Sequence, residues 1–455
     1  MFLTMLSRRI LSLVLILSTV VKSVTSTEKC LSDGQVVIVG AGPSSLFFAN
    51  ILLQQNPTVS VQIVEKNSRD GTPDQGAFGF GIGCRHEKLL EPIPGMWEQL
   101  KEVSAPTKFG LRIIRRNDLC SKLRSRLEST YPERFKILYE TQCENIDFKQ
   151  NLVLLKNGSS IFYDLLVGAD GANSMVRASI RKDDAGYAEE HYFRPILWKS
   201  LRLPDQKGEV DPRAVIPISG GGFRTGGLLP RYPEGHTILA FWDNLNLQNP
   251  EGVHDEEGLV KAITTGLQAK MSVFQKLVYF KRQRTEESLN IEFDDIELKR
   301  FLQGQANREH ILKLRKYHHN ENVALMGDAA HAMYSLLGQG AACGFLTASM
   351  LAQSLGREIN ISTALENYSN DAVPAANAIV DLNLVTHVLD GGLLIKLATA
   401  LLSLFDALRG SVLFKDVAHT NMPYQEILKR NRLLIWICKQ VFKKRRVTAP
   451  THRKI

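Results

Sequence analysis

Cysteine is scarce in this sequence, and no long apolar run continues without interruption. The six cysteines among 455 residues are widely spaced, show no metal-ligand spacing and form no recognisable disulfide framework. The N-terminal apolar run from Ile10 to Val21 is too short to predict a membrane span. A second run, 393–408, is interrupted by Lys396 and Asp406, which favours a buried or interfacial helix. We therefore predict no metal site, and the sequence assigns neither a disulfide framework nor a membrane-spanning helix.

Positive charge exceeds negative charge, and the formal net charge is +9. Much of the excess lies between Arg430 and Arg446, where cations and apolar residues are mixed. This mixture suits an anionic membrane surface; the alternative is a solvated basic tail after a packed helix. Nucleic-acid binding is not predicted, because no recognition fold accompanies the charge. The remaining composition is that of a globular enzyme, long enough for more than one domain.

The N-terminal 27 residues have the features of a targeting segment. Arg8 and Arg9 precede the apolar run, small residues follow from 23 to 26, and no acidic residue occurs before Glu28. This order is typical of a secretory signal peptide. It predicts the secretory pathway, the endoplasmic reticulum or a membrane-associated location, with an uncleaved signal anchor or a mitochondrial presequence as alternatives.

A glycine-rich turn follows the first apolar strand, Val36 to Val39, and opens a helix-like run. Gly40 permits the tight turn, and Gly42 lets the backbone approach a pyrophosphate at the helix start. Glu65 ends the next strand about 20 residues later, where a carboxylate can bind an adenosine ribose. Ser45 replaces the third glycine of the pattern and adds a side chain where helix and strand pack closely.

Two further strands end in similar turns. The buried-strand pattern 164–167 stops at a turn that contains Asp170 and Gly171, and the pattern 323–326 stops before Gly327 and Asp328. Small residues beside each acid leave room for a ligand to lie against the chain. With the first turn, the three segments predict one FAD site.

These segments resemble the group A FAD-dependent aromatic hydroxylases, the p-hydroxybenzoate hydroxylase-like family, and among them the kynurenine 3-monooxygenase-like members. The resemblance extends from Gln35 to Asp381. It implies that Gly40, Gly42 and Glu65 hold the ADP part of FAD and that Asp328 binds the flavin ribitol. It also associates Asp170 and Gly171, with Arg177 beyond them, with FAD and a passing nicotinamide cofactor, either NADPH or NADH.

The resemblance places Arg116, ahead of leucines 119, 123 and 127, beside the FAD phosphates or ribose. The alternative is an exposed cation in the basic run of Arg112, Arg115 and Arg116. Further along, the resemblance implies that a turn points the start of a helix at the flavin ring, where free amides and the helix dipole stabilise negative charge. That turn consists here of Gly338, Gln339, Gly340 and Ala341.

Two segments depart from the family pattern. The family places a proline before the Gly-Gln-Gly turn, whereas this chain reads Tyr-Ser-Leu-Leu around Ser335. Kynurenine-type members continue with Met-Asn-Ala-Gly-Phe-Glu-Asp, whereas residues 341–347 read Ala-Ala-Cys-Gly-Phe-Leu-Thr. FAD binding tolerates these changes because backbone groups carry most of it, but kynurenine does not follow as the substrate.

The side chains that carry chemistry are few. Arg85, at the end of a glycine-rich segment, is our candidate for binding a substrate carboxylate, because a guanidinium offers a bidentate fork; the alternative is a surface arginine at a helix start. His331 is interpreted as a hydrogen-bonded structural histidine and Cys343 as a packed residue. Arg231, Phe241 or Trp242 can face the pocket or pack structurally. No catalytic residue is assigned.

The order of patterns predicts an α/β fold: a doubly wound parallel-sheet FAD-binding domain with an inserted antiparallel substrate domain and C-terminal helices. The predicted divisions are a targeting segment at 1–27, the FAD-binding domain at 31–190 and 316–381, the antiparallel domain at 191–315 and a C-terminal helical region with a basic tail at 382–455.

The predicted function is an FAD-dependent monooxygenase that uses NADPH or NADH and transfers one oxygen atom from O2 to an aromatic or unsaturated apolar small molecule. The alternatives are an FAD-dependent reductase or dehydrogenase without oxygen transfer, and a non-catalytic, membrane-associated flavin-binding protein.

Overall fold

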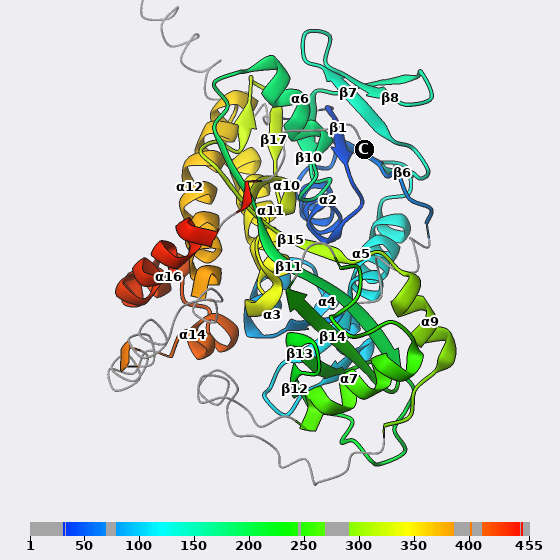
Figure 1. Cartoon of the computed structure of the whole chain (residues 1–455). Helices are drawn as coiled ribbons and strands as arrows, with labels where there is room; N and C mark the ends of the chain where they lie inside the picture. Colours follow the sequence, from blue (N-terminus) through cyan, green and yellow to red (C-terminus); the bar gives the residue numbers. More distant parts are fainter. Residues whose placement is uncertain are drawn as a thin grey trace, which may run out of the picture.

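The computed structural model describes residues 31, 33–69, 79–243, 247–268, 291–385, 401–402, 412–445 and 447–448. The predicted targeting segment 1–27 lies outside these residues, as does the apolar run 393–408 apart from 401 and 402. Within the described part, Figure 1 shows a mainly parallel sheet above an antiparallel sheet, with C-terminal helices along one side.

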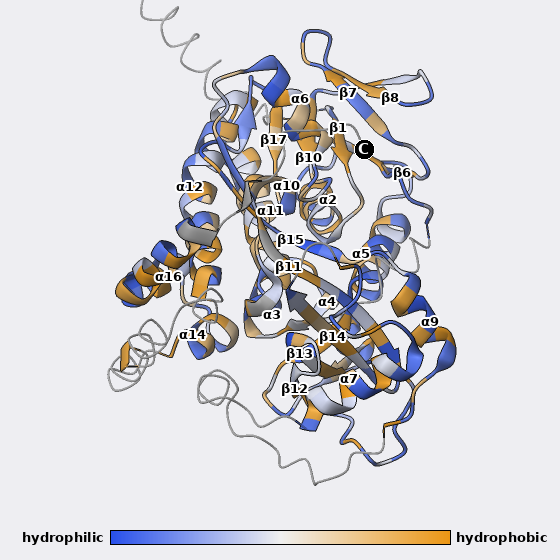
Figure 2. Ribbon diagram, in the orientation of Figure 1, coloured by the Kyte–Doolittle hydropathy of each residue, from blue (hydrophilic) through white to orange (hydrophobic). Residues whose placement is uncertain are grey.

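The upper sheet has six strands. They are β1 (Gln35–Val39), β2 (Ser60–Val64), β6 (Phe135–Leu138), β10 (Leu165–Gly168), β16 (His318–His319) and β17 (Val323–Leu325). Their order is β16-β17-β10-β1-β2-β6, parallel except for the edge strand β16. At the centre, Ile38 of β1 is in register with both Ile63 and Val167. The central strands β1, β10 and β17 are apolar runs without alternation because both faces of the sheet are buried there, and Figure 2 shows them as hydrophobic.

Helices pack around this sheet. They are α2 (Pro43–Gln55), α5 (Arg116–Thr130), α6 (Met175–Asp183), α11 (Gly340–Arg357) and α12 (Ile361–Leu382). α2 contacts both α5 and α11, and Phe47 stacks on Phe345 with ring centroids 4.3 Å apart. The N-cap of α12 is Asn360, whose side chain accepts hydrogen bonds from two backbone amides of the first turn. This packing fixes the starts of α2 and α11 relative to the sheet.

The lower sheet is antiparallel. Its strands are β11 (Glu189–Leu203), β12 (Ile216–Gly220), β13 (Phe223–Pro230), β14 (His236–Asp243) and β15 (Asn307–Leu314), and β18 (Val447–Thr448) pairs with β11. The order is β12-β13-β14-β11-β15. Two helices, α7 (Glu256–Gln268) and α9 (Asp295–Gln303), contribute to the apolar cluster beside it, which includes Trp242 and Phe301. The predicted α/β fold with a separate antiparallel sheet is confirmed.

Two small sheets and several short helices complete this part of the chain. The strands are β3 (Gly79–Ile82), β4 (Ser104–Pro106), β5 (Arg112–Arg115), β7 (Cys143–Asp147), β8 (Leu152–Leu155) and β9 (Ser160–Phe162). The helices are α3 (Cys84–Leu90), α4 (Met96–Glu102), α10 (Asp328–His331) and the 3-10 turn η1 (Ser335–Leu337). β3 and β5 pair so that Gly79 is opposite Arg115, which brings the start of α5 beside the glycine-rich strand.

The C-terminal helices are α14 (Leu413–His419), α15 (Tyr424–Arg430) and α16 (Arg432–Arg445). Asp381, near the end of α12, is buried and forms ion pairs with Lys313 of β15 and Lys439 of α16. This shared carboxylate ties α16 to the body of the molecule. None of the helices in the described residues is long and apolar enough to cross a bilayer.

Candidate cofactor-binding site

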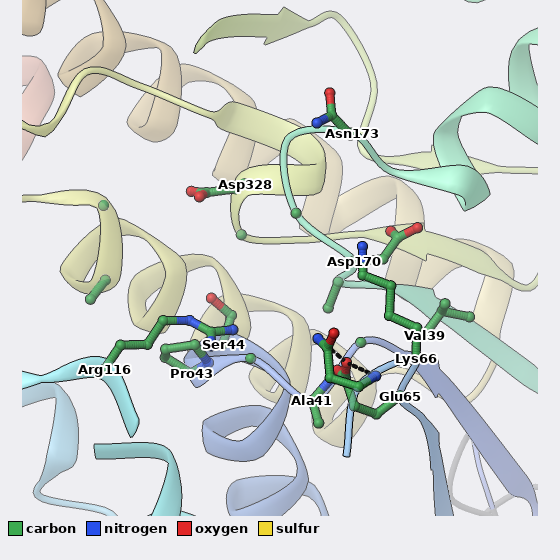
Figure 3. A pocket seen from close by; sticks show the side chains of 18 of the residues that line it. Val39, Ala41, Pro43, Ser44, Glu65, Lys66, Arg116, Asp170, Asn173 and Asp328 are labelled. Atoms are coloured by element: carbon green, nitrogen blue, oxygen red, sulfur yellow. Dashed lines mark hydrogen bonds between the residues drawn. The ribbon is translucent and has the colours of Figure 1, made fainter. Parts of the chain in front are cut away.

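A cavity of about 470 Å³ lies where β1, β10 and β17 end. It is lined by all three predicted turns, namely by 39–44, by 169–171 and by 327–328, together with Glu65, Arg116, Ser335, Gly338, Gly340 and Ala341. Figure 3 shows Arg116 reaching toward Pro43 and Ser44, and Asp328 pointing into the same space. Ligands of open α/β sheets bind at this carboxyl edge of the strands.

The first turn leaves the start of α2 open to the cavity. Gly40 has φ +98°, and a Cβ there would lie 2.6 Å from the carbonyl oxygen of Ala169. Gly42, at the N-cap of α2, has no side chain to cap the helix, and a Cβ there would meet only the Arg116 guanidinium at 3.5 Å. The departure at Ser45 is accommodated, because its buried Oγ donates to the Gly42 carbonyl at 2.8 Å. An anion is the natural ligand for the free amides of such a helix start.

Glu65 fastens the end of β2 to the first turn. Its Oε2 accepts a hydrogen bond from the Ala41 amide at 2.8 Å, and Oε1 accepts from the amide and side chain of Asn67. Oε2 keeps a further lone pair, whereas Oε1 already accepts two hydrogen bonds, and the residue lines the cavity. The carboxylate is thus held in place with acceptor capacity left for a sugar hydroxyl.

Asp170 joins the second turn to helix α6. Its Oδ2 accepts from the Met175 amide at 2.5 Å, whereas Oδ1 is buried without a hydrogen-bond partner among the described residues. Burial raises the pKa of this carboxyl. Next to it, Gly171 has φ +82°. The Arg177 guanidinium already has protein partners. It donates to the carbonyls of Ala172 and Ala329 and so ties the second turn to the third.

Asp328 follows Gly327 at the end of β17. Gly327 has φ +59°, and a Cβ there would lie 2.7 Å from Ser44 Oγ, so the third turn packs tightly on the first. The Asp328 side chain is open to the cavity but surrounded by the cavity walls, and this burial raises its pKa while nearby Arg116 opposes the rise. Within the described chain no group donates a hydrogen bond to this carboxylate, which leaves it available to a ligand.

Arg116 differs from the other cations of its run. Arg112 donates to the Ser104 and Lys101 carbonyls, and Arg115 forms a two-pronged ion pair with Asp118. Arg116 lines the cavity and has no hydrogen bond to the described part of the chain. The structure therefore places it with Asp328 and the start of α2, not on an exposed basic face.

The Gly-Gln-Gly turn forms another wall. Gly338 has φ +62°, and a Cβ at Gly338 or Gly340 would meet no protein atom within 4 Å. Gln339 is different: it is 5% exposed, it does not line the cavity, and its side chain is bound to the Leu337 carbonyl and to the Tyr424 hydroxyl. The turn thus offers backbone and empty space to a ligand, while its one long side chain faces away.

In the segment where the family has a proline, hydrogen bonds to Glu309 hold Ser335 in place. The amide and hydroxyl of Ser335 both donate to Glu309 Oε1, at 2.8 and 2.5 Å. Glu309 lies on β15 and is 5% exposed. A proline at position 335 has no N–H and would lose the first of these bonds. The carboxylate therefore anchors this part of the cavity wall.

His331 and Cys343 are buried behind the third turn. His331 Nε2 lies 3.0 Å from Thr347 Oγ1, and its Nδ1 is 3.5 Å from Cys343 Sγ. Burial lowers the pKa of His331 to about 4 and raises the pKa of the Cys343 thiol. The imidazole is therefore neutral at pH 7, and neither residue lines the cavity. Both have the packed, structural setting that the sequence indicated.

The candidate substrate residues lie outside the cavity lining. The Arg85 guanidinium is over the Tyr424 ring, 4.3 Å from its centroid, and donates to the Met422 carbonyl at 2.8 Å. Arg231 donates to the Leu203 carbonyl, and Trp242 is buried and donates to the Leu247 carbonyl. The role of Arg85 in binding a substrate stays a prediction that this packing does not support.

Several lining residues escaped the sequence interpretation. They are Lys66, Asn67, Phe80, Thr141, Gln142, Cys143, Asn173, Met175, Met333 and Tyr334. Lys66 directly follows Glu65, so its position could have been found from the motif. Thr141 and Gln142 precede β7, Cys143 begins it, and none of the three belongs to a motif. Glu309 acts from a different sheet, so the sequence carried no signal for any of these four residues.

The residues present fit FAD. The fit rests on the uncapped start of α2, the cation of Arg116, the unbonded carboxylate of Asp328, the orphaned Oδ1 of Asp170 and the two glycines that face empty space. An elongated ligand with a phosphate group near its middle and hydroxyl groups on both sides matches this order of donors and acceptors.

Comparison with known proteins shows to which family the chain belongs. The model of a family described as "FAD binding domain" matches residues 149–383, just over half of the chain. The chain belongs to this FAD-binding family. The matched region contains the second and third turns and the Gly-Gln-Gly turn, and the resemblance to group A FAD-dependent monooxygenases is confirmed.

Relatives of this FAD-binding protein include kynurenine 3-monooxygenases. That of Drosophila willistoni is 25% identical over 291 residues, covering 60% of this chain and 57% of the relative. That of Salinispora tropica is 24% identical over 444 residues, covering 87% and 90%. The FAD-dependent monooxygenase ausM of Penicillium brasilianum is 25% identical, covering 72% and 71%. The chain thus spans little more than half of the first of these relatives.

Solved structures support the fold of the FAD-binding protein. The tetrameric form of 2-methyl-3-hydroxypyridine-5-carboxylic acid oxygenase has a TM-score of 0.60 and 21% identity, covering 91% of this chain and 98% of that one. The tetracycline destructase Tet(51) has a TM-score of 0.55 and 14% identity, covering 92% and 100%. At these identities the likeness concerns the fold alone.

Proposed function

We propose that the protein is an NAD(P)H- and FAD-dependent monooxygenase. The observation that carries the proposal is the wall formed by Gly338, Gly340 and Ala341 at the start of the 18-residue helix α11, in the same cavity as Asp328. Amides and dipole at such a helix start favour negative charge on a reduced ligand. When bound, FAD accepts a hydride from a nicotinamide and passes the electrons to O2.

The chain's own groups have distinct proposed roles. Arg116 and the start of α2 bind the phosphates, Glu65 accepts from the adenosine ribose, and Asp328 accepts from the ribitol chain. Asp170 and Gly171 shape the wall of the second turn. Ser335, held by Glu309, keeps the wall ahead of the Gly-Gln-Gly turn in position. We retain the divisions at 191–315 and 382–455 as proposals.

The proposed substrate is an aromatic or unsaturated apolar small molecule. Phe80, Met333 and Tyr334 give the cavity lining an apolar part. Two of the similar proteins are named for the aromatic compounds kynurenine and 2-methyl-3-hydroxypyridine-5-carboxylic acid. Kynurenine itself is not proposed, because residues 341–347 lack the amide and both acids of the kynurenine-type motif.

Anaerobic stopped-flow spectroscopy tests this function. FAD-loaded protein is mixed with NADPH or NADH, then with O2, in the presence of a panel of substituted aromatic compounds. We expect reduction of the bound flavin by at least one nicotinamide, followed by O2-dependent formation of a product that carries one additional oxygen atom. The Asp328→Ala variant, tested without added FAD, is the control for turnover that does not require bound cofactor.

The other outcomes separate the remaining functions. Reduction followed by reoxidation, with all electrons recovered as H2O2 for every compound, would favour a reductase or dehydrogenase. FAD that binds but is reduced by neither nicotinamide would favour a non-catalytic flavin-binding protein. Either result would contradict oxygen transfer while leaving the FAD site intact.

We also propose that helix α16 binds an anionic membrane surface. Leu433 and Trp436, three residues apart on this helix, are 61% and 60% exposed, and Arg432 and Lys443 are exposed on the same helix. A helix that presents apolar and cationic side chains together suits a lipid interface. The secretory or mitochondrial destination carried by 1–27 stays a prediction.

Vesicle sedimentation tests the membrane proposal. We expect Leu433→Ser combined with Trp436→Ser to reduce binding to vesicles that contain phosphatidylserine by more than about tenfold, because two apolar contacts with lipid are lost. Ile296→Ser removes a 77% exposed side chain from α9, across the molecule in Figure 1, and is the matched control. Equal binding by wild type and the double variant would contradict the proposal.

A further inference from the structure

The Gly-Gln-Gly turn, which we propose faces the flavin ring, is held by contacts on the side away from the cavity. Gly338 and Gly340 have no neighbouring protein atom on the cavity side, so Gln339 is the only residue of the three whose side chain can restrain the turn. Its Nε2 donates to the Leu337 carbonyl at 3.2 Å, and its Oε1 accepts from the Tyr424 hydroxyl at 2.9 Å. The orientation of the Gln339 amide is thereby set by one local and one distant contact.

The distant contact comes from the C-terminal region. Tyr424 is the first residue of α15 and is 1% exposed. Its ring lies under the Arg85 guanidinium, which also donates to the carbonyl of Met422, two residues earlier. Burial raises the pKa of the Tyr424 hydroxyl far above its ordinary value, so the group stays protonated and donates at any working pH. Arg85 and Gln339 therefore hold the same tyrosine from two sides.

The geometry points to Tyr424 as a positioning residue for the flavin-facing turn. Its hydroxyl fixes Gln339, which fixes the backbone of 338–341 and the start of α11. The segment from Met422 through α15 thus forms an outer wall of the cofactor site, although it lies beyond the region matched by the family. This inference rests on FAD binding and is independent of oxygen transfer.

Tyr424→Phe tests the role because it removes only the hydroxyl. We expect the Kd for FAD to rise about 3- to 10-fold, as for the loss of one buried hydrogen bond. We also expect a more negative midpoint potential of the bound flavin, because a loosened helix start stabilises the reduced form less. Both are measured without turnover, by fluorescence titration and by spectroelectrochemistry.

Tyr187→Phe is the matched control. Its hydroxyl donates to the Lys316 carbonyl at 2.7 Å, it is 8% exposed and it does not line the cavity. We expect this variant to lose stability but to keep the wild-type Kd and potential. Tyr424→Phe and Gln339→Leu both remove the contact between these residues, and Gln339→Leu additionally removes only the 3.2 Å bond to the Leu337 carbonyl. Their effects on the potential should therefore be less than additive in the double variant.

Two results would overturn the inference: a wild-type Kd and potential in Tyr424→Phe, or equal changes in Tyr424→Phe and Tyr187→Phe. If Tyr424→Phe fails to fold, Gln339→Leu carries the same expectation, since it leaves Tyr424 and Arg85 in contact. Failure of oxygen transfer in the stopped-flow experiment affects neither measurement, so the two proposals fail separately.

Discussion

Replacing Asp328 with alanine is expected to weaken FAD binding by ~1 to 3 kcal/mol, or about 5- to 150-fold in Kd. The carboxylate points into the cavity, burial raises its pKa, and none of the described residues donates a hydrogen bond to it. A ligand hydroxyl is therefore the partner that the variant would lose. Fluorescence titration of the apoprotein with FAD measures the change.

Asp371→Ala is the control for this experiment, because Asp371 is an exposed acid on α12 outside the cavity lining. Its removal should leave the Kd for FAD unchanged. A wild-type Kd for FAD in Asp328→Ala would show that the third turn does not bind the ribitol chain.

Alanine substitutions at two glycines of the first turn are expected to have different effects, one on folding stability and the other on FAD binding. Gly40→Ala is expected to lower the free energy of unfolding by more than ~2 kcal/mol, because it combines φ +98° with a Cβ 2.6 Å from the Ala169 carbonyl. Gly42→Ala has ordinary dihedral angles and only the Arg116 side chain nearby, so it should fold normally but bind FAD about tenfold or more weakly, since the methyl group enters the cavity. Urea unfolding of the apoprotein and FAD titration measure the two effects.

Gly158→Ala supplies the reference for strain alone. Gly158 has φ +86°, no atom within 4 Å of an added Cβ and no place in the cavity lining, so alanine there should cost only about 1 kcal/mol. Equal losses of stability in Gly40→Ala and Gly158→Ala would show that the contact with Ala169 is unimportant. Normal FAD affinity in Gly42→Ala would contradict a close backbone approach at the first turn.

The parts of the site that the sequence predicted share one physical property. Gly40, Asp170 and Asp328 lie within three residues of the ends of apolar strands, and parallel strands of one sheet end at a common edge. Patterns that are local in the sequence therefore predict that residues far apart along the chain lie close together in space. The fold class followed in the same way, because runs of apolar residues and alternating patterns distinguish buried parallel strands from half-buried antiparallel ones.

The contacts that no sequence pattern indicated depend on side-chain direction within loops. Gln339 belongs to the predicted turn, yet its side chain binds Tyr424, 85 positions away. Arg85, the candidate for binding a substrate carboxylate, packs on the same tyrosine. Ser335 lies in the segment where the family has a proline, and Glu309, on the other sheet, anchors this segment instead. No periodicity or spacing encodes such contacts.

The buried interior continues past the point where similarity to the family ends. The match stops at residue 383, but Tyr424, Ile427, Leu434 and Cys438 belong to the same apolar cluster as the central strands. A chain cut at that point would uncover this apolar surface and would leave Asp381 without Lys439. The unit that folds is therefore longer than the unit that sequence comparison detects.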